Sequence, residues 1–207
     1  MNVDGLYRTE ATLDCSCLVI RTSRSNSCST NKVTFFFFLK RTTPFTFEAE
    51  YLSTEELSSP PTTLEAGDKL LIEAVKQLSA YDYDKTAQTV QKIVKEEASF
   101  ANPLWQAKAY NLYATFLLCG MHHDAAITYL NKSLALAPED INSLLKLGSL
   151  LTIKESAETG QPLIDKAAAL AGEDNPDVAF ARATMLADSG DMENAIALYE
   201  KVTLSLF

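Results

Sequence analysis

The amino-acid sequence predicts an all-α fold, a helical solenoid of about four helix–turn–helix pairs preceded by a segment without helical character. Two observations support this prediction. From Thr63 onward, apolar residues recur with the period of an α-helix. Small residues also recur about every 34 residues: Ala126, Gly160 and Ala195 are separated by 34 and 35 residues. A period of that length is typical of stacked helical pairs.

The expected helices can be placed in order along the chain. The first follows Thr63, where four apolar residues share one face: Leu70, Leu71, Ala74 and Leu78. Asp140 and Asn175 are predicted N-caps, because their side chains can accept hydrogen bonds from free backbone N–H groups. The other helices are expected at 85–97, 103–120, 124–137, 140–154, 161–171, 176–189 and 192–207.

Residues 1–60 are predicted to form a separate, disordered or atypical N-terminal segment, and residues 61–207 the helical array. The segment contains many Ser and Thr residues, a run of four Phe and the stop Pro60-Pro61. A transit peptide and a start that is not native to the domain are alternatives.

The last residues of the chain, up to Phe207, are mostly apolar, whereas helical arrays usually end in a polar capping helix. This pattern predicts a fragment, a truncated product or a surface that needs a partner.

The alternation of small and large residues resembles the tetratricopeptide repeat (TPR) family. Gly190, Ala195 and Tyr199 mark the turn and second helix of one such unit. Small residues let two helix backbones approach closely, and large residues fill the neighbouring holes. The resemblance implies units at about 63–100, 103–140, 141–174 and 175–207. It also implies packing roles for further residues: Ala114, Leu117, Ala126, Pro138, Leu147, Gly148, Leu151 and Ala183.

Composition and motifs favour binding over catalysis. The net charge of −9 disfavours nucleic acid as a partner, because phosphates need Lys and Arg. His122 and His123 are adjacent in a predicted turn, and no catalytic, nucleotide or zinc motif is present. We therefore expect no enzyme, no metal and no cofactor.

The apolar stretch 33–39 is too short to span a bilayer. Cys119 is expected to be a buried thiol.

One binding mode of the TPR family can be tested directly on the sequence. TPR domains that clamp the acidic C-terminal tails of chaperones use Lys, Asn and Arg side chains on successive first helices. The corresponding positions here hold Asn111, Thr115, Lys146, Asp177 and Ala181. The clamp is absent, so binding of chaperone tails is not expected.

A narrower resemblance concerns the large TPR import receptor of the mitochondrial outer membrane. The stretches 83–85, 114–120, 145–149, 161–163, 165–168 and 175–178 follow its C-terminal repeats in order. The resemblance implies a non-catalytic scaffold on the cytosolic face of that membrane, which recognises mitochondrial preproteins through peptide segments. The groove candidates are Asn111, Lys146 and Ser149. The alternative is a structural subunit of a cytoplasmic multiprotein complex.

Overall fold

The computed structural model describes residues 51–58, 60 and 63–204. All of them belong to the second of the two units into which the chain divides, residues 43–207. The predictions for residues 1–50 and for the end of the chain at Phe207 lie outside the described residues.

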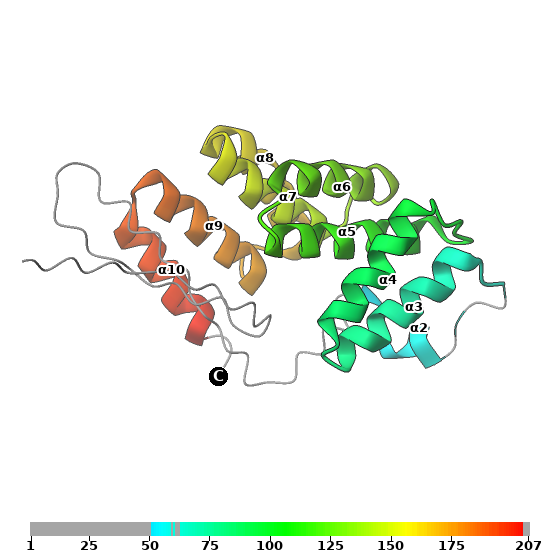
Figure 1. Ribbon diagram of the computed structural model, residues 1–207. Helices are drawn as coiled ribbons and strands as arrows, with labels where there is room; N and C mark the ends of the chain where they lie inside the picture. Colours follow the sequence, from blue (N-terminus) through cyan, green and yellow to red (C-terminus); the bar gives the residue numbers. More distant parts are fainter. Residues whose placement is uncertain (1–50, 59, 61–62, 205–207) are drawn as a thin grey trace, which may run out of the picture. The chain divides into compact units, whose positions relative to one another are not determined.

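All secondary structure in the described part is helical, which confirms the all-α prediction for that part (Figure 1). A short helix, α2 (Thr54–Ser58), precedes eight longer ones. These are α3 (Ala66–Ser79), α4 (Tyr83–Lys95), α5 (Pro103–Cys119), α6 (His123–Leu136), α7 (Ile141–Lys154), α8 (Ala157–Ala171), α9 (Pro176–Ser189) and α10 (Met192–Leu204).

The eight longer helices pack as four hairpins. The most extensive helix–helix contacts are those of α3 with α4, α5 with α6, α7 with α8 and α9 with α10. Successive hairpins touch through α4 and α5, α6 and α7, and α8 and α9. Two pairs of first helices, α3 with α5 and α7 with α9, are also in contact. The chain is therefore built from consecutive hairpins, each packed against the next.

Each hairpin carries a buried pair of small residues twelve positions apart. The first member lies on the first helix, and the second is the fourth residue of the second helix. All eight residues of the four pairs are buried. The pairs are Ala74 with Thr86, Ala114 with Ala126, Gly148 with Gly160, and Ala183 with Ala195. The same register in all four hairpins indicates that one packing arrangement is repeated.

The turns inside the hairpins repeat as well. In each, an N–H bonds the carbonyl five residues earlier, as from His122 to Leu117 at 2.8 Å and from Asp191 to Leu186 at 2.9 Å. Tyr81, Met121 and Gly190 hold equivalent places, five residues before the second small residue. All three have positive φ angles, of 60°, 59° and 91°. Only glycine adopts this conformation without steric cost.

Two predicted N-caps are confirmed. The Asp140 carboxylate accepts from the Ser143 N–H at 2.9 Å, and Asn175 Oδ1 accepts from the Asp177 N–H at 2.9 Å. Satisfying these donors explains why α7 and α9 begin where they do.

Three sequence predictions are wrong in detail. Helix α8 begins at Ala157 rather than 161, because Ser156 caps it and Pro162 lies inside it. Pro162 is exposed, so water can reach the backbone carbonyl that its missing N–H leaves without an intrahelical partner.

Helix α4 begins at Tyr83, two residues earlier than predicted, because the Asp82 side chain caps it. Cys119 is exposed rather than buried, since it is the last residue of α5, beside the turn.

Candidate functional site

Asn111 lies in the middle of α5, and its amide connects that helix to α7. The side chain is only 3% exposed. Its Nδ2 donates to Ser143 Oγ at 2.6 Å and to Asp140 Oδ2 at 3.1 Å, and its Oδ1 accepts from Lys146 Nζ at 2.8 Å. A buried amide with both ends bonded fixes the relative position of the helices that it joins.

Lys146, on α7, brings a positive charge to the same place. Its Nζ also donates to Thr115 Oγ1 at 3.0 Å and to the Tyr51 hydroxyl at 3.4 Å. The ammonium lies 5.4 Å from the centroid of the Tyr51 ring, a distance typical of cation–π attraction. Lys146 therefore links α5 and α7 to a residue that precedes all eight longer helices.

Buried serines extend these bonds to α6. Ser133 Oγ donates to the Ala107 carbonyl at 2.9 Å, and the Ser133 and Ser143 hydroxyls are 3.0 Å apart. Both serines are fully buried. We refer to these residues as the Asn111 network: Asn111, Thr115, Ser133, Asp140, Ser143 and Lys146. The network crosses from the second hairpin to the third and so sets how the two meet.

Of the three predicted groove residues, the structure brings two together. Asn111 and Lys146 are bonded to each other. Ser149 is half-buried one turn further along α7, and its side chain has no hydrogen bond to a described residue.

The residues assigned to repeat packing fall into three groups by exposure. Leu117 and Leu151 are half-buried, whereas Pro138 and Gly190 are exposed. Tyr199 is buried, and its hydroxyl lies 3.1 Å from Thr184 Oγ1. The others are buried: Ala114, Ala126, Leu147, Gly148, Ala183 and Ala195.

Sequence reasoning missed the segment Tyr51–Ser58, which packs onto the first helices. Tyr51 and Leu52 are 2% and 0% exposed and belong to one apolar cluster with residues of α3 and α5. We call the surface that receives the segment the first-helix face. It comprises the α3 and α5 residues that share this apolar cluster, among them Leu71, Val75, Leu78, Trp105 and Leu112, and the polar partners Lys108, Thr115 and Lys146.

Glu56 anchors the other end of this segment. Its carboxylate accepts from the Trp105 indole N–H and from Lys108 Nζ, each at 3.2 Å. It also accepts from the Ser53 N–H at 2.7 Å, while Ser53 Oγ accepts from the Glu56 N–H at 3.1 Å. The spacing Ser53-x-x-Glu56 is a capping box, the one sequence signal that would have revealed α2.

The same contacts shift the ionisation of Glu56. Partial burial acts to raise the pKa of Glu56, but the Ser53 N–H and Lys108 outweigh it. The net result is a pKa below the ordinary value, because hydrogen bonds and a nearby cation favour the charged form.

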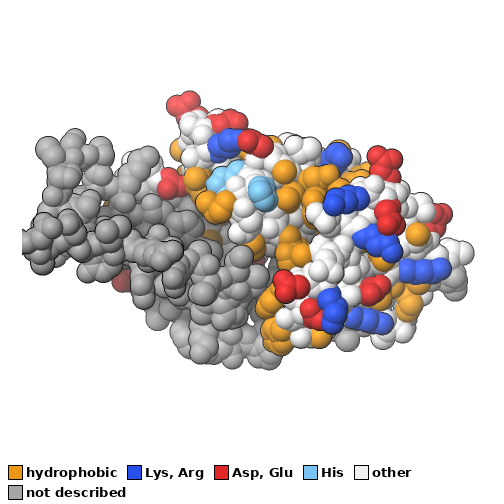
Figure 2. Space-filling view, viewed as in Figure 1, with side chains coloured by type: hydrophobic (Ala, Val, Ile, Leu, Met, Phe, Trp, Pro, Cys, Tyr) orange, Lys and Arg blue, Asp and Glu red, His pale blue; other side chains and the backbone are white. Residues whose placement is uncertain are grey.

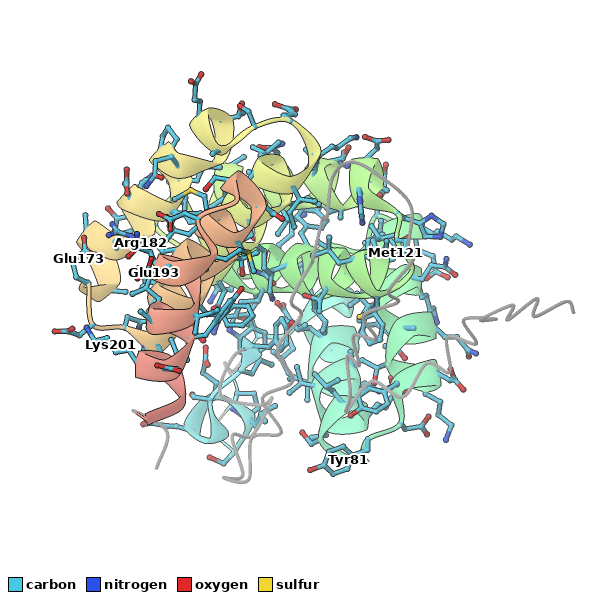
Figure 3. The ribbon with its side chains drawn as sticks, turned by 90° about the vertical axis from the view of Figure 1, so that its left-hand side faces the viewer. Tyr81, Met121, Glu173, Arg182, Glu193 and Lys201 are labelled. Carbon is cyan, nitrogen blue, oxygen red and sulfur yellow. The ribbon has the colours of Figure 1, made fainter. Side chains whose placement is uncertain are left out.

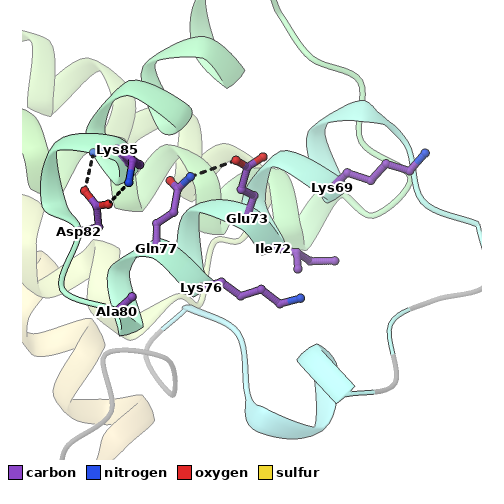
Figure 4. Close-up of a pocket in the computed structure, with 8 residues that line it drawn as sticks. All are labelled: Lys69, Ile72, Glu73, Lys76, Gln77, Ala80, Asp82 and Lys85. Atoms are coloured by element: carbon purple, nitrogen blue, oxygen red, sulfur yellow. Dashed lines mark hydrogen bonds and ion pairs between the residues drawn. The ribbon is translucent and has the colours of Figure 1, made fainter.

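A separate open depression of about 560 Å³ lies along α3 and the α3–α4 turn (Figure 4). Four of its polar groups pair with each other: Lys85 with Asp82 at 2.6 Å, and Gln77 with Glu73 at 3.0 Å. Lys69 and Lys76 also line it, outside these two pairs. Side chains already paired in this way do not converge on a shared ligand position. We therefore assign no ligand to this depression.

Ion pairs bind the later hairpins together. Arg182 of α9 contacts Asp165 of α8 at 3.2 Å and Glu173 of the following loop at 2.8 Å, and Lys201 contacts Asp174 at 2.8 Å (Figure 3). On the face in Figure 2, acidic and basic side chains are interspersed over the α3–α4 end. Partly exposed pairs of this kind contribute little stability each.

The two histidines of the chain lie at the start of α6. His122 is exposed and His123 half-buried (Figure 2). Within residues 51–204, as far as they are described, no three His, Cys, Asp or Glu side chains are arranged to hold a metal ion. None of the described helices combines the length and apolar character needed to cross a membrane.

Comparison with known proteins adds no assignment: no family model matches the chain, and no curated protein sequence matches it.

Proposed function

We propose that the chain is a non-catalytic scaffold of the TPR type that binds proteins through peptide segments. The four matched small pairs and the repeated turn bond support the repeat interpretation. Hairpins stacked in this way place their first helices beside one another, and such a row offers an extended surface for a peptide.

One observation carries the peptide-binding part of the proposal: the first-helix face already holds a peptide segment. Tyr51 and Leu52 fill its apolar part, and Glu56 bonds its cationic part at Lys108. Apolar anchors combined with a few well-placed polar groups are typical of peptide recognition.

A more specific form of the proposal rests on the residue resemblance described above. In that form the chain acts at the cytosolic face of the mitochondrial outer membrane and recognises internal segments of carrier-type preproteins. The charge of the first-helix face bears on the ligand. Although the chain as a whole is acidic, Lys108 and Lys146 make this face locally cationic. It therefore suits peptides that carry carboxylates better than basic ones.

Binding of labelled peptides to the full chain tests the proposal. Peptides tiled across carrier-type preproteins are measured by fluorescence anisotropy, with scrambled peptides as controls. We expect some peptides to bind, and Lys146→Ala to weaken them about tenfold, the effect of one charge-assisted bond. Ser149→Ala, on the same helix, serves as the matched control and should have little effect. If neither the wild type nor the Glu56→Lys variant described below binds any peptide better than its scrambled control, the import form of the proposal is wrong.

A further inference from the structure

The segment Tyr51–Ser58 is attached to the repeats in the way a bound peptide would be. Among the described residues, no backbone–backbone hydrogen bond joins it to another helix, and the bond from Leu57 N–H to the Ser53 carbonyl stays inside it. Its contacts with α5 and α7 are made by side chains, from Tyr51 to Thr115 and Lys146, and from Glu56 to Trp105 and Lys108. An element held in this way can open without unfolding the helices beneath it.

The apolar anchors share a buried cluster with one stripe of α3. Leu71, Val75 and Leu78 lie at i, i+4 and i+7 on α3, so they form one face of that helix. Tyr51 and Leu52 belong to the same cluster as this stripe and Leu112 of α5. If the segment leaves, the apolar surface that these two residues cover needs another aromatic or aliphatic occupant.

The polar contacts define what else the occupant needs. The Lys108 ammonium and the Trp105 indole N–H both point at one carboxylate, that of Glu56. Glu56 is four residues after Leu52, and the start of α2 at Thr54 lies between them. The face is thus fitted to an aromatic–aliphatic pair followed, four residues later, by a carboxylate.

We propose that Tyr51–Ser58 is an internal ligand of the first-helix face, and that external peptides of the same chemistry bind by displacing it. This inference rests on the proposed peptide-binding function and adds to it a ligand pattern and a built-in competitor. A short tether gives a segment an effective concentration on the order of millimolar. A competitor present at that concentration sets a threshold that weakly matching peptides do not pass.

The test uses the full chain and a labelled peptide with the sequence of residues 50–60. Trp105, the only tryptophan of the chain, is buried and bonded to Glu56, so its emission reports release of the segment. Glu56→Lys reverses the charge opposite Lys108, whereas Glu55→Lys makes the same change at an exposed neighbour. The two variants have the same composition and differ only in this contact.

We expect Glu56→Lys to shift the Trp105 emission to the red and to bind the peptide about tenfold more tightly than the wild type. Added peptide should reverse the red shift, and Glu55→Lys should match the wild type. Equal peptide affinity in Glu56→Lys and wild type would overturn the proposal. So would loss of helical circular dichroism from the first hairpin in Leu52→Asp, because the segment would then be a permanent part of the core.

The outcomes separate this inference from the proposed function. If the 50–60 peptide binds Glu56→Lys but no preprotein peptide binds either protein, the internal ligand stands and the import form fails. If preprotein peptides bind wild type and Glu56→Lys equally well, peptide binding stands and the internal ligand is rejected.

Discussion

The first and third hairpins build the same helix pair in two different ways. In the third, Gly148 and Gly160 face each other so closely that a methyl group on Gly160 would overlap the Gly148 carbonyl oxygen and Thr152 Oγ1. In the first hairpin, the matched residues are Ala74 and Thr86, both buried. Chain segments outside this hairpin pack against it. The segment Tyr51–Ser58 packs on one side of it.

The linker between α4 and α5 adds to this cover. It occupies residues 96–102, whereas the equivalent linkers occupy 137–140 and 172–175. The Ser99 carbonyl accepts from the Gly67 N–H at 2.7 Å, and the buried Asp68 carboxylate accepts from the Ala101 N–H at 3.0 Å. A repeat unit of this chain is thus stabilised either by close backbone contact inside it or by neighbouring segments that complete its core.

The largest effect is expected at the close contact of the third hairpin. Gly160→Ala should destabilise the chain by about 3 kcal/mol, because the added methyl group meets backbone atoms that cannot move away. Urea unfolding followed by circular dichroism measures it. Gly120→Ala is the control, since its φ of −82° suits alanine and its nearest neighbour is a His122 side chain at 3.0 Å. Equal stability of the two variants would contradict the close contact.

A smaller effect is expected where the first hairpin meets its cover. A methyl group on Gly67 would lie 2.5 Å from Phe100 and 2.6 Å from the Ser99 carbonyl oxygen. Both belong to a linker, which can shift, so Gly67→Ala should cost about 1–2 kcal/mol. The same urea experiment applies. A cost as large as that of Gly160→Ala would mean that the linker is as rigid as a helix.

The repeated turns offer a test of opposite sign. Met121 holds the positive φ that Gly190 holds in the last hairpin. Met121→Gly should stabilise the chain by about 0.5–1 kcal/mol by removing steric strain, whereas Gly190→Ala should destabilise it by about 1 kcal/mol. Thermal unfolding should show shifts of about 2–4 °C in opposite directions. Shifts of the same sign would show that the two turns are not equivalent.

The smallest effect concerns pH and the cover of the first hairpin. Because the pKa of Glu56 is lowered from 4.5 in the folded chain, its charged form contributes stability above that value. The contribution is lost as the pH falls through the lowered pKa, so acid should shift the Trp105 emission to the red. Glu56→Gln should remove this dependence and Glu55→Gln should keep it. An unchanged acid response in Glu56→Gln would exclude Glu56 as its source.

Local patterns in the sequence predicted most helices correctly. Apolar periodicity and the caps at Asp140 and Asn175 depend on neighbours within a few turns. The recurrence of Ala126, Gly160 and Ala195 at 34 and 35 residues can be found by direct comparison along the sequence. The start of α8 was missed because Pro162 favours a first turn, while the weaker signal of Ser156 determines the actual start.

Site residues were harder to predict, because residue type alone does not tell whether a polar group is already bonded. Asn111 was expected to line a groove, and it is buried with its amide bonded to α7. Lys146 meets Tyr51, which is 95 residues away along the chain. No periodic pattern connects positions so far apart.

Sequence alone was enough to place most of the longer helices, since backbone hydrogen bonds and side-chain periodicity act over one or two turns. Which helix faces are covered, and by which segments, became clear only from the packed structure. Burial of Leu52, pairing of Glu56 with Lys108, and the backbone contact of Gly148 with Gly160 all arise when separate segments exclude water together. That exclusion depends on the whole packed chain rather than on any local stretch.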